Sequence, residues 1–225
     1  LFFTEMWERF SYYGMRGLLK AYMVYYLVSS FGAKLYQSDF PEPPKEVPSN
    51  PFNFIGFDVL ASMPTWLVAH TSVQDFASSM YGMYTALVYA TPFLGGILAD
   101  RYIGQRKAVY IGGIVMALGH FVMASERLFF VALGLLIVGN GFFKPNISTQ
   151  VGDLYPEGDS RRDSAFTIFY MGINLGAMFC NLVCATLAQE VGWHWGFGAA
   201  GVGMCIGLAT YLLGRRWLAP EAPRA

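Results

Sequence analysis

Six stretches of the 225-residue chain carry almost only apolar side chains, and each is long enough to cross a membrane as a helix. A hydrocarbon core about 30 Å thick needs roughly 20 such residues per helix. The connections between the last five stretches are short, so consecutive helices are expected to run antiparallel. The predicted fold class is an all-α membrane protein, a bundle of six transmembrane helices at residues 1–28, 77–99, 108–124, 128–154, 165–187 and 195–213.

Residues 33–76 break this pattern. Residues 38–51 include five prolines, which neither a helix nor a strand ladder accommodates. Residues 52–69 have the length of a span, but Asn53, Asp58 and Pro64 argue against one, and we expect them to lie at the outer membrane surface with Trp66 as an anchor. The predicted organisation is one bundle: a first helix within 1–32, an extracytoplasmic insertion at 33–76, Pro-rich and then interfacial, and helices two to six with a cytoplasmic tail at 77–225.

The basic residues predict an orientation. If the first helix runs outward from the cytoplasm and residues 52–69 do not cross, eight basic residues fall inside and three outside, as the positive-inside rule requires. The eight are Arg101, Arg106, Lys107, Arg161, Arg162, Arg215, Arg216 and Arg224, and the three are Lys34, Lys45 and Arg127. We therefore expect a multi-pass protein of the bacterial inner membrane or the plasma membrane, with its N-terminus in the cytoplasm.

Composition agrees with a bilayer as the main partner. Apolar residues make up 55% of the chain and charged residues 13%, whereas a soluble domain has about 25% charged residues. Fifteen basic and fifteen acidic residues cancel, so no basic field is left to bind nucleic acid. The three cysteines lie in apolar runs without CxxC or nearby histidine, which indicates packing residues and predicts no metal site. The chain opens at Leu1 within an apolar run, so we expect its true start to be missing.

Ionisable residues nevertheless lie inside the predicted spans. Each costs at least ~2.5 kcal/mol at the bilayer centre unless it is paired or hydrated, so these residues are expected to face the bundle interior or an aqueous cavity. At 100° per residue, those of the first helix share a stripe about 140° wide with two tyrosines. The stripe consists of Glu5, Glu8, Arg9, Tyr12, Tyr13, Arg16 and Lys20, and the fourth helix adds Lys144.

The stripe suits proton binding. Glu5 and Arg9 form an i,i+4 pair with the acid first, which is the favourable order. Two carboxylates beside one guanidinium are not equivalent, and we expect one to be paired while the other is available to take up a proton. The alternative is a buried ion-pair network that only holds the bundle together.

The other helices add polar residues of less specific meaning. Asn140 lies one turn before Lys144, and Pro145 is expected to free backbone carbonyls toward a cavity. Lysine can lose its proton where arginine cannot, so Lys144 suits a proton-linked contact; the alternative is a lysine reaching the membrane interface. Tyr170 with Asn174, and Tyr89 beside Pro92, indicate helix packing as readily as ligand binding.

Four motifs resemble those of the proton-dependent oligopeptide transporters, a branch of the major facilitator superfamily. Residues 5–14 are similar to the family's ExxERFxYYG signature, 139–146 to its GxGxxKPN segment, and 169–176 to its FYxxINxG signature. Residues 96–107 resemble the superfamily's loop between helices two and three. The resemblance implies proton-coupled symport of di- and tripeptides by alternating access, with the proton as coupling ion and no cofactor.

The resemblance also implies roles for single residues. The proton-coupling residues would be Glu5, Glu8, Arg9 and Lys144. The substrate-binding residues would be Arg16, Lys144, Tyr12, Tyr13, Tyr89, Asn140, Tyr170 and Asn174. The gating or structural residues would be Asp100, Arg101, Gly104, Arg106, Lys107 and Pro145. Protonation of one glutamate would free a cation for the peptide carboxylate.

Three features depart from the family pattern. Gly82 stands where animal members carry a histidine, and Lys20 adds a cation where an apolar residue is usual. The family has at least twelve spans, so this chain would be an N-terminal six-helix half of 3+3 inverted repeats, with the C-terminal six-helix bundle as its missing partner. That missing half would supply the acid for the peptide amino end.

Other functions remain open at this point. Some members of the family carry nitrate or other small anions, and the same pocket would serve a channel or a non-transporting peptide sensor. An enzyme is not expected, because HExxH and GxSxG motifs are absent from the sequence and His70, His120 and His194 are scattered.

Overall fold

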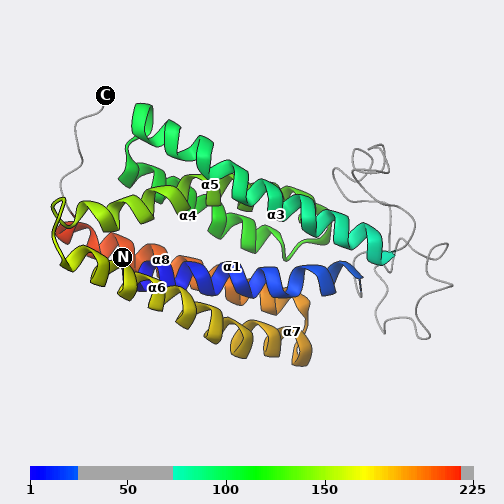
Figure 1. The fold of residues 1–225 in the computed structure, drawn as a ribbon. Coiled ribbons are helices and arrows are strands. Elements are labelled where there is room, and N and C mark those ends of the chain that lie inside the picture. The colour runs from blue at the N-terminus through cyan, green and yellow to red at the C-terminus, as the bar shows by residue number, and fades with distance from the viewer. Residues whose placement is uncertain (25–72, 219–225) are drawn as a thin grey trace.

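The computed structural model describes residues 1–24 and 73–218, and these residues are helical without a strand (Figure 1). The predicted all-α class is therefore confirmed. The long helices are α1 (Phe2–Tyr22), α3 (Val73–Leu98), α4 (Gln105–Val122), α5 (Phe129–Asp153), α6 (Arg161–Cys180) and α8 (Trp193–Gly214). The short elements are the π-helices η2 (Ala99–Ile103) and η4 (Asn181–Ala185), the 3₁₀ turns η3 (Glu126–Leu128) and η5 (Arg215–Trp217), and α7 (Thr186–Glu190).

The predicted and observed helices differ mainly at their ends. The second helix begins at Val73 rather than at residue 77, because its first turn carries the polar residues Gln74 and Asp75, which a search for apolar runs leaves out. An acid in the first turn also suits the positive end of the helix dipole. The rest of the predicted insertion, including Trp66, lies outside the described residues.

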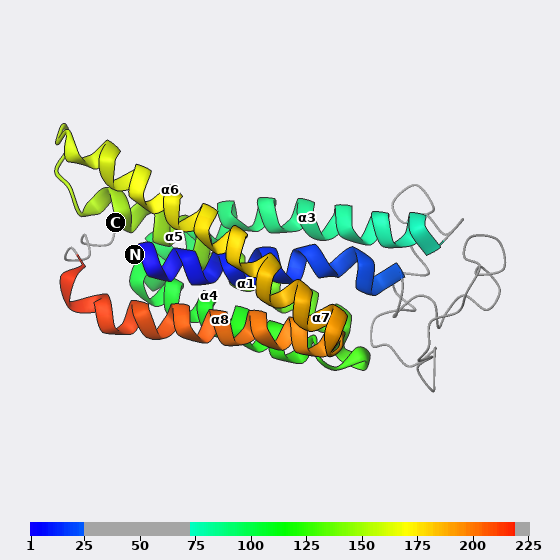
Figure 2. The same ribbon diagram turned by 90° about the horizontal axis from the view of Figure 1, so that it is seen from below.

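Four segments are long and apolar enough to cross a membrane: Gln74–Ile103, Glu126–Asp153, Arg161–Glu190 and Trp193–Trp217. The predicted spans α1 and α4 fall outside this set. The charged stripe of α1 lowers its hydropathy, and α4 opens with the three polar residues Gln105, Arg106 and Lys107. α1 packs against α6 and α8 (Figures 1 and 2), whereas α4 packs against α5 and α8 and keeps exposed apolar side chains such as Ile114 and Leu118 on its outer face.

The helices pack as two interlocked groups. α1 lies against α6 and α8, α5 lies against α3 and α4, and contacts between α4 and α8 join the groups. If α1, α3 and α4 are one repeat and α5, α6 and α8 the other, each repeat's first helix packs on the last two helices of its counterpart. Figure 1 shows α1 and α5 running in opposite directions, as inverted repeats require.

Two prolines explain how α3 meets α5. Pro92 has no N–H, so the carbonyl of Val88 loses its partner within α3. The amide Nδ2 of Asn140, on α5, donates to that carbonyl at 3.0 Å. Pro145 likewise frees the carbonyl of Gly141, and that oxygen lies against Gly95 of α3, where a Cβ atom would collide with it. The expectation that Pro145 opens carbonyls toward a cavity is therefore wrong, because the freed oxygen faces a neighbouring helix.

The turn before α6 carries an ion pair outside the membrane. Asp159 accepts hydrogen bonds from the backbone N–H of Arg161 at 2.9 Å and from its guanidinium at 2.7 Å. These bonds favour the charged carboxylate and lower the pKa of Asp159 to about 2. The pair is therefore complete at neutral pH and is lost only as the pH falls toward 2.

We expect Asn140→Leu to lower the free energy of unfolding by about 1–3 kcal/mol, because the buried Val88 carbonyl then has no donor. Pro92→Ala restores an N–H to α3, so the cost of Asn140→Leu should shrink in a Pro92→Ala background. Denaturation of the full-length protein in detergent measures this double-mutant cycle.

Asn146→Leu is the matched control. The Asn146 amide bonds the Phe142 carbonyl within α5, so its cost should be the same with and without Pro92. Additive effects of Asn140→Leu and Pro92→Ala would contradict the proposed capping of Val88.

Candidate functional site

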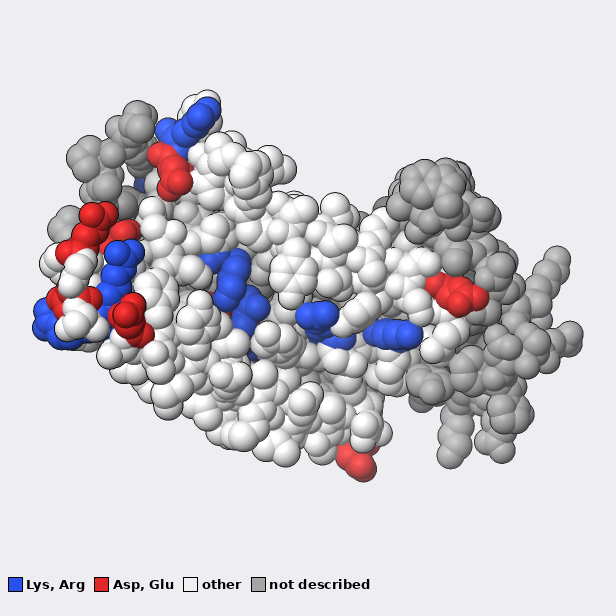
Figure 3. All heavy atoms as spheres, viewed as in Figure 1, with Lys and Arg blue, Asp and Glu red and all other residues white. Residues whose placement is uncertain are grey.

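The charged face of α1 is sheltered by its neighbours. Glu5 and Glu8 are fully buried and Arg9 is 7% exposed. Figure 3 shows a row of basic side chains along the middle of one face, where α1 lies in Figure 1, with uncharged side chains on both sides. The stripe predicted from helical periodicity is therefore present as a polar line along an apolar bundle.

Glu8 is the close partner of Arg9. The guanidinium Nη2 donates to Glu8 Oε1 at 2.6 Å, and Nε donates to Glu8 Oε2, so the pair is bidentate. Arg9 Nε also lies 3.3 Å from Glu5 Oε1, which is the i,i+4 contact predicted from the sequence. The guanidinium thus contacts both carboxylates and has its best geometry with the adjacent one.

Glu5 carries a second cation. Lys144 Nζ forms an ion pair with Glu5 Oε1, which links α1 to α5. The predicted convergence of the first and fourth helices on one cluster is confirmed, and Lys144 bonds an acid instead of extending to the membrane interface. The expectation that one glutamate is paired while the other is available to take up a proton stays a prediction, since in this structure each glutamate has a cation, Arg9 for Glu8 and Lys144 for Glu5.

The cluster of Glu5, Glu8, Arg9 and Lys144 has no net charge when all four are ionised, which lowers the cost of burying it. One atom remains unsatisfied: Glu5 Oε2 is buried and has no hydrogen-bond partner among the described residues. Glu8 is therefore bonded through both carboxylate oxygens, whereas Glu5 has one bonded oxygen and one without a donor.

Tyrosines continue the site along α1. Tyr12 is 4% exposed, and its ring lies 4.8 Å from the Arg9 guanidinium carbon and 5.9 Å from that of Arg16. Arg16 Nε donates to the hydroxyl of Tyr81 on α3 at 2.6 Å. A pocket of about 280 Å³ opens beside them, lined by Tyr13, Arg16, Gly17, Tyr81, Ala177, Cys180 and Asn181.

Tyr81 and Asn181 were not predicted as site residues. Tyr81 stands eight residues before Tyr89, close to two helical turns, so the same face of α3 could have indicated it. Asn181, the first residue of the π-helix η4, stands seven residues or about two helical turns after Asn174, so the same face of α6 could have indicated it.

The remaining predicted binding residues have different surroundings. Tyr89 and Tyr170 are 70% and 57% exposed, and Asn174 is exposed with its amide bonded to the Tyr170 carbonyl at 3.1 Å. Lys20 is half-buried further along α1. Asn140 is buried, and its side chain joins α5 to α3 as described above.

The predicted gating segment lies at the turn from α3 to α4. Asp100 and Arg101 are exposed in the π-helix η2, and Lys107 is exposed on α4. Gly104 has φ 89°, a conformation that favours glycine. Arg106 Nη2 donates to the Leu218 carbonyl at 3.1 Å, which ties α4 to the residue that follows η5. Gly104 and Arg106 thus have structural roles, while contact of this segment with another bundle stays a prediction.

Paired charges lining one side of a helical membrane bundle are characteristic of membrane carriers. Residues 106–224, more than half of the chain, match the family model PTR2, described as the POT family. The chain belongs to the POT family, and proteins of this family are integral membrane transporters.

Curated relatives agree with this assignment. The chain is 41% identical over 219 residues to the uncharacterized transporter YclF of Bacillus subtilis, covering 96% of the chain and 37% of that protein. It is 38% identical over 227 residues to a di-/tripeptide transporter of Lactococcus lactis, covering 100% of the chain and 38% of that protein. The chain therefore spans little more than a third of the length of these relatives.

Solved structures agree as well. A crystal structure of a peptide transporter POT in complex with sulfate is 40% identical, with a TM-score of 0.72 over 96% of this chain and 37% of that one. A POT family transporter in complex with a thioalcohol conjugated peptide is 33% identical, with a TM-score of 0.75 over 100% of this chain and 39% of that one.

Gly104→Ala should destabilise the protein by about 1–3 kcal/mol, because alanine strains at this backbone conformation. Unfolding of the full-length protein in detergent measures the loss. Gly82→Ala is the control, since a Cβ atom there meets nothing within 4 Å and Gly82 lies inside the helix α3. Equal effects of the two substitutions would refute the strain at Gly104.

Proposed function

We propose that the full-length protein containing this chain is a proton-coupled symporter of di- and tripeptides that works by alternating access. The chain would form its N-terminal six-helix half, and a C-terminal six-helix bundle would complete it. Membership of the POT family, the peptide transporters among its relatives and the share of their length that the chain spans support this proposal.

The site chemistry suits a zwitterionic peptide. Arg16 and Lys144 would bind the peptide carboxylate, because both carry cations along the same polar line. Tyr12, Tyr13 and Tyr89 would contact the peptide side chains, and Asn174 and Tyr170 the backbone near the amino end. An acid for the amino group would come from the C-terminal bundle.

Proton coupling would act through the ion pair between Glu5 and Lys144, which is the observation that carries the proposal. While Glu5 is ionised, Lys144 is held by it. A proton on Glu5 removes the negative charge and releases Lys144 Nζ to the incoming carboxylate. Loss of that proton inside the cell restores the ion pair and expels the peptide, while Arg9 stays with Glu8.

One coupled proton supplies enough energy for accumulation. Moving one charge through 100 mV is worth about 2.3 kcal/mol, and ~1.4 kcal/mol corresponds to tenfold, so one proton supports roughly fifty-fold accumulation. This free energy is used only if peptide binding depends on protonation, as competition for Lys144 would ensure.

The orientation belongs to the same proposal. With the N-terminus in the cytoplasm, the loops that carry Arg101, Arg106, Lys107, Arg161 and Arg162 lie inside, in agreement with the positive-inside rule. Asp100 and the basic residues after it would then contact the C-terminal bundle on the cytoplasmic side. A carrier of nitrate or another small anion, or a peptide sensor without transport, is the alternative that uptake assays distinguish.

Glu5→Gln should abolish uptake driven by a pH gradient in proteoliposomes while it leaves peptide exchange at equal pH, because the neutral amide leaves Lys144 permanently free. Radiolabelled dipeptide uptake and counterflow measure the two activities. Glu126→Gln, a change in the 3₁₀ turn η3 away from the cluster, is the control and should retain both. Accumulation by Glu5→Gln in response to a pH gradient would defeat the proposed coupling.

Tyr81→Phe should weaken peptide affinity by about 3- to 10-fold, because a hydrogen bond that holds the Arg16 guanidinium is lost. The dependence of uptake on the pH gradient should stay, since the cluster around Glu5 is unchanged. Tyr110→Phe, on α4, is the control. Unaltered affinity in Tyr81→Phe would show that this hydrogen bond does not position Arg16 for substrate.

A further inference from the structure

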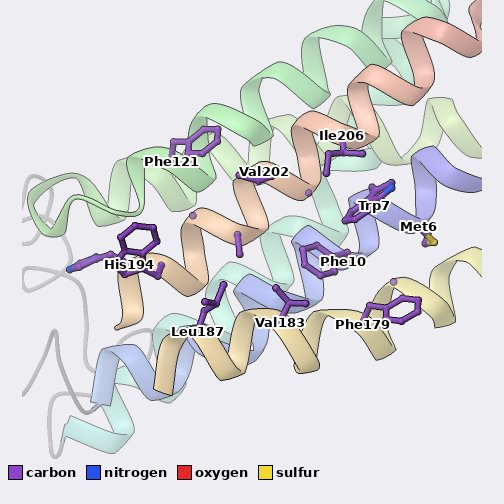
Figure 4. Close-up of a pocket in the computed structure, with 15 residues that line it drawn as sticks. Met6, Trp7, Phe10, Phe121, Phe179, Val183, Leu187, His194, Val202 and Ile206 are labelled. Carbon is purple, nitrogen blue, oxygen red and sulfur yellow. The ribbon is translucent and has the colours of Figure 1, made fainter. Parts of the chain in front are cut away.

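A second hollow lies on the far side of α1 from the charged stripe. It has a volume of about 790 Å³, and its lining comes from α1, α4, α6 to α7, and α8. In Figure 4, α8 runs through the middle, with Trp7 and Phe10 of α1 and Val183 of η4 on one side and Phe121 of α4 on the other. His194 is the only titratable residue that lines it in the described part of the chain.

The position of this groove on α1 separates it from the transport site. Taking Glu5 as the reference at 100° per residue, Met6, Trp7 and Phe10 point about 100–200° away, while the stripe stays within about 80° of Glu5. The groove therefore opens on the side opposite the polar line. The C-terminal bundle, which would complete the peptide site, is expected on the polar side.

The surroundings of the groove are those of membrane hydrocarbon. Its walls belong to the segments Arg161–Glu190 and Trp193–Trp217, which are long and apolar enough to span a bilayer. The rims carry exposed apolar side chains, among them Phe179, Trp195 and Val202. An apolar concavity of this size would be filled by a ligand in a soluble protein, and in a bilayer the abundant apolar ligand is an acyl chain.

The dimensions match one lipid leaflet. From Trp195 to Ile206 the groove follows α8 for eleven residues, about 17 Å of helix, close to half of a hydrocarbon core about 30 Å thick. The groove begins at His194 and Trp195, and tryptophan favours the level of the head groups. His194 Nε2 lies 3.9 Å from Glu126 Oε1, so this end is polar while the interior is not.

We propose that this groove binds an acyl chain of a phospholipid from the leaflet at the α7–α8 end, with the head group near His194. The lipid packs on the back of α1, the helix whose front carries Glu5, Glu8 and Arg9. It thereby supports the cluster from behind without touching substrate. This inference requires only that the helices span a membrane, so it stands or falls independently of peptide transport.

Two glycines of α8 shape the groove that the acyl chain would occupy. A Cβ atom at Gly203 would meet Phe10 at 2.5 Å, so α8 lies close to α1 at the floor of the groove. Gly198, which also lines the groove, has nothing within 4 Å of the position of a Cβ atom. A larger residue at position 198 therefore fills the groove without colliding with the protein.

Photo-crosslinking tests the proposal. The full-length protein is reconstituted in vesicles of phosphatidylethanolamine and phosphatidylglycerol that contain a phosphatidylethanolamine with a diazirine in its acyl chain, and adducts are mapped by mass spectrometry after irradiation. We expect adducts on Met6 and Trp7, which are the residues of α1 that line the groove together with Phe10. We expect them to be lost in Gly198→Leu and kept in Gly134→Leu, an open and exposed position on α5 outside the groove.

Two results would overturn the proposal. Labelling of Met6 and Trp7 that is equal in Gly198→Leu and Gly134→Leu would mean that the lipid does not occupy the groove. Labelling of Ile114 and Leu118, exposed on α4, without labelling of Met6 and Trp7 in the unmodified protein would mean that another part of the polypeptide fills it. The second result needs no substitution, so it decides the matter even if Gly198→Leu fails to fold. Peptide uptake measured on the same vesicles reports separately on the proposed function.

Discussion

The ion pair between Glu5 and Lys144 is the contact on which the arrangement of the site depends. Burying a single charge in hydrocarbon is costly, and α1 carries two acids that neither water nor lipid can satisfy. Arg9 alone cannot neutralise both, so α5 must lie close enough to bring a second cation. The requirement for neutrality therefore determines how near two helices lie that are far apart in sequence, and it leaves a single carboxyl oxygen of Glu5 without a donor.

The same rule governs the backbone. A membrane supplies no water to a carbonyl that has lost its helical partner. Each proline in a span therefore requires another hydrogen-bond donor for the carbonyl four residues before it. Pro92 leaves the Val88 carbonyl without its donor in α3, and the Asn140 side chain of α5 supplies a donor. In the sequence Asn140 looks like a ligand-binding residue, but its side-chain amide is already bonded to the backbone of α3. Residues that shape the site and residues that maintain its walls share the same helix faces, and their sequence pattern does not separate them.

Much of the fold follows from the sequence, because apolar runs of membrane length and their short connections leave few arrangements. The face of α1 that carries the charges also follows, since helical periodicity alone places Glu5, Arg9 and Arg16 together. The contacts that these side chains make do not follow from the sequence. Glu8 pairs with Arg9, its neighbour in sequence, because long side chains can swing toward each other when both are buried. Tyr81 meets Arg16 through the packing of α3, and the role of Asn140 depends on a proline 48 residues away, so neither contact is visible along a single helix.

The packing of each repeat's first helix on the last two helices of the other repeat has a consequence for how the protein is made. Among the described helices α1 leaves the ribosome first, and the helices that enclose it, α6 and α8, leave only after α5. Its charges make it a poor candidate for lasting contact with lipid on its own. The final environment of α1 exists only once α8 has entered the membrane. The ion pair with Lys144 needs only α5, whereas the apolar walls around α1 are complete only when α6 and α8 have followed.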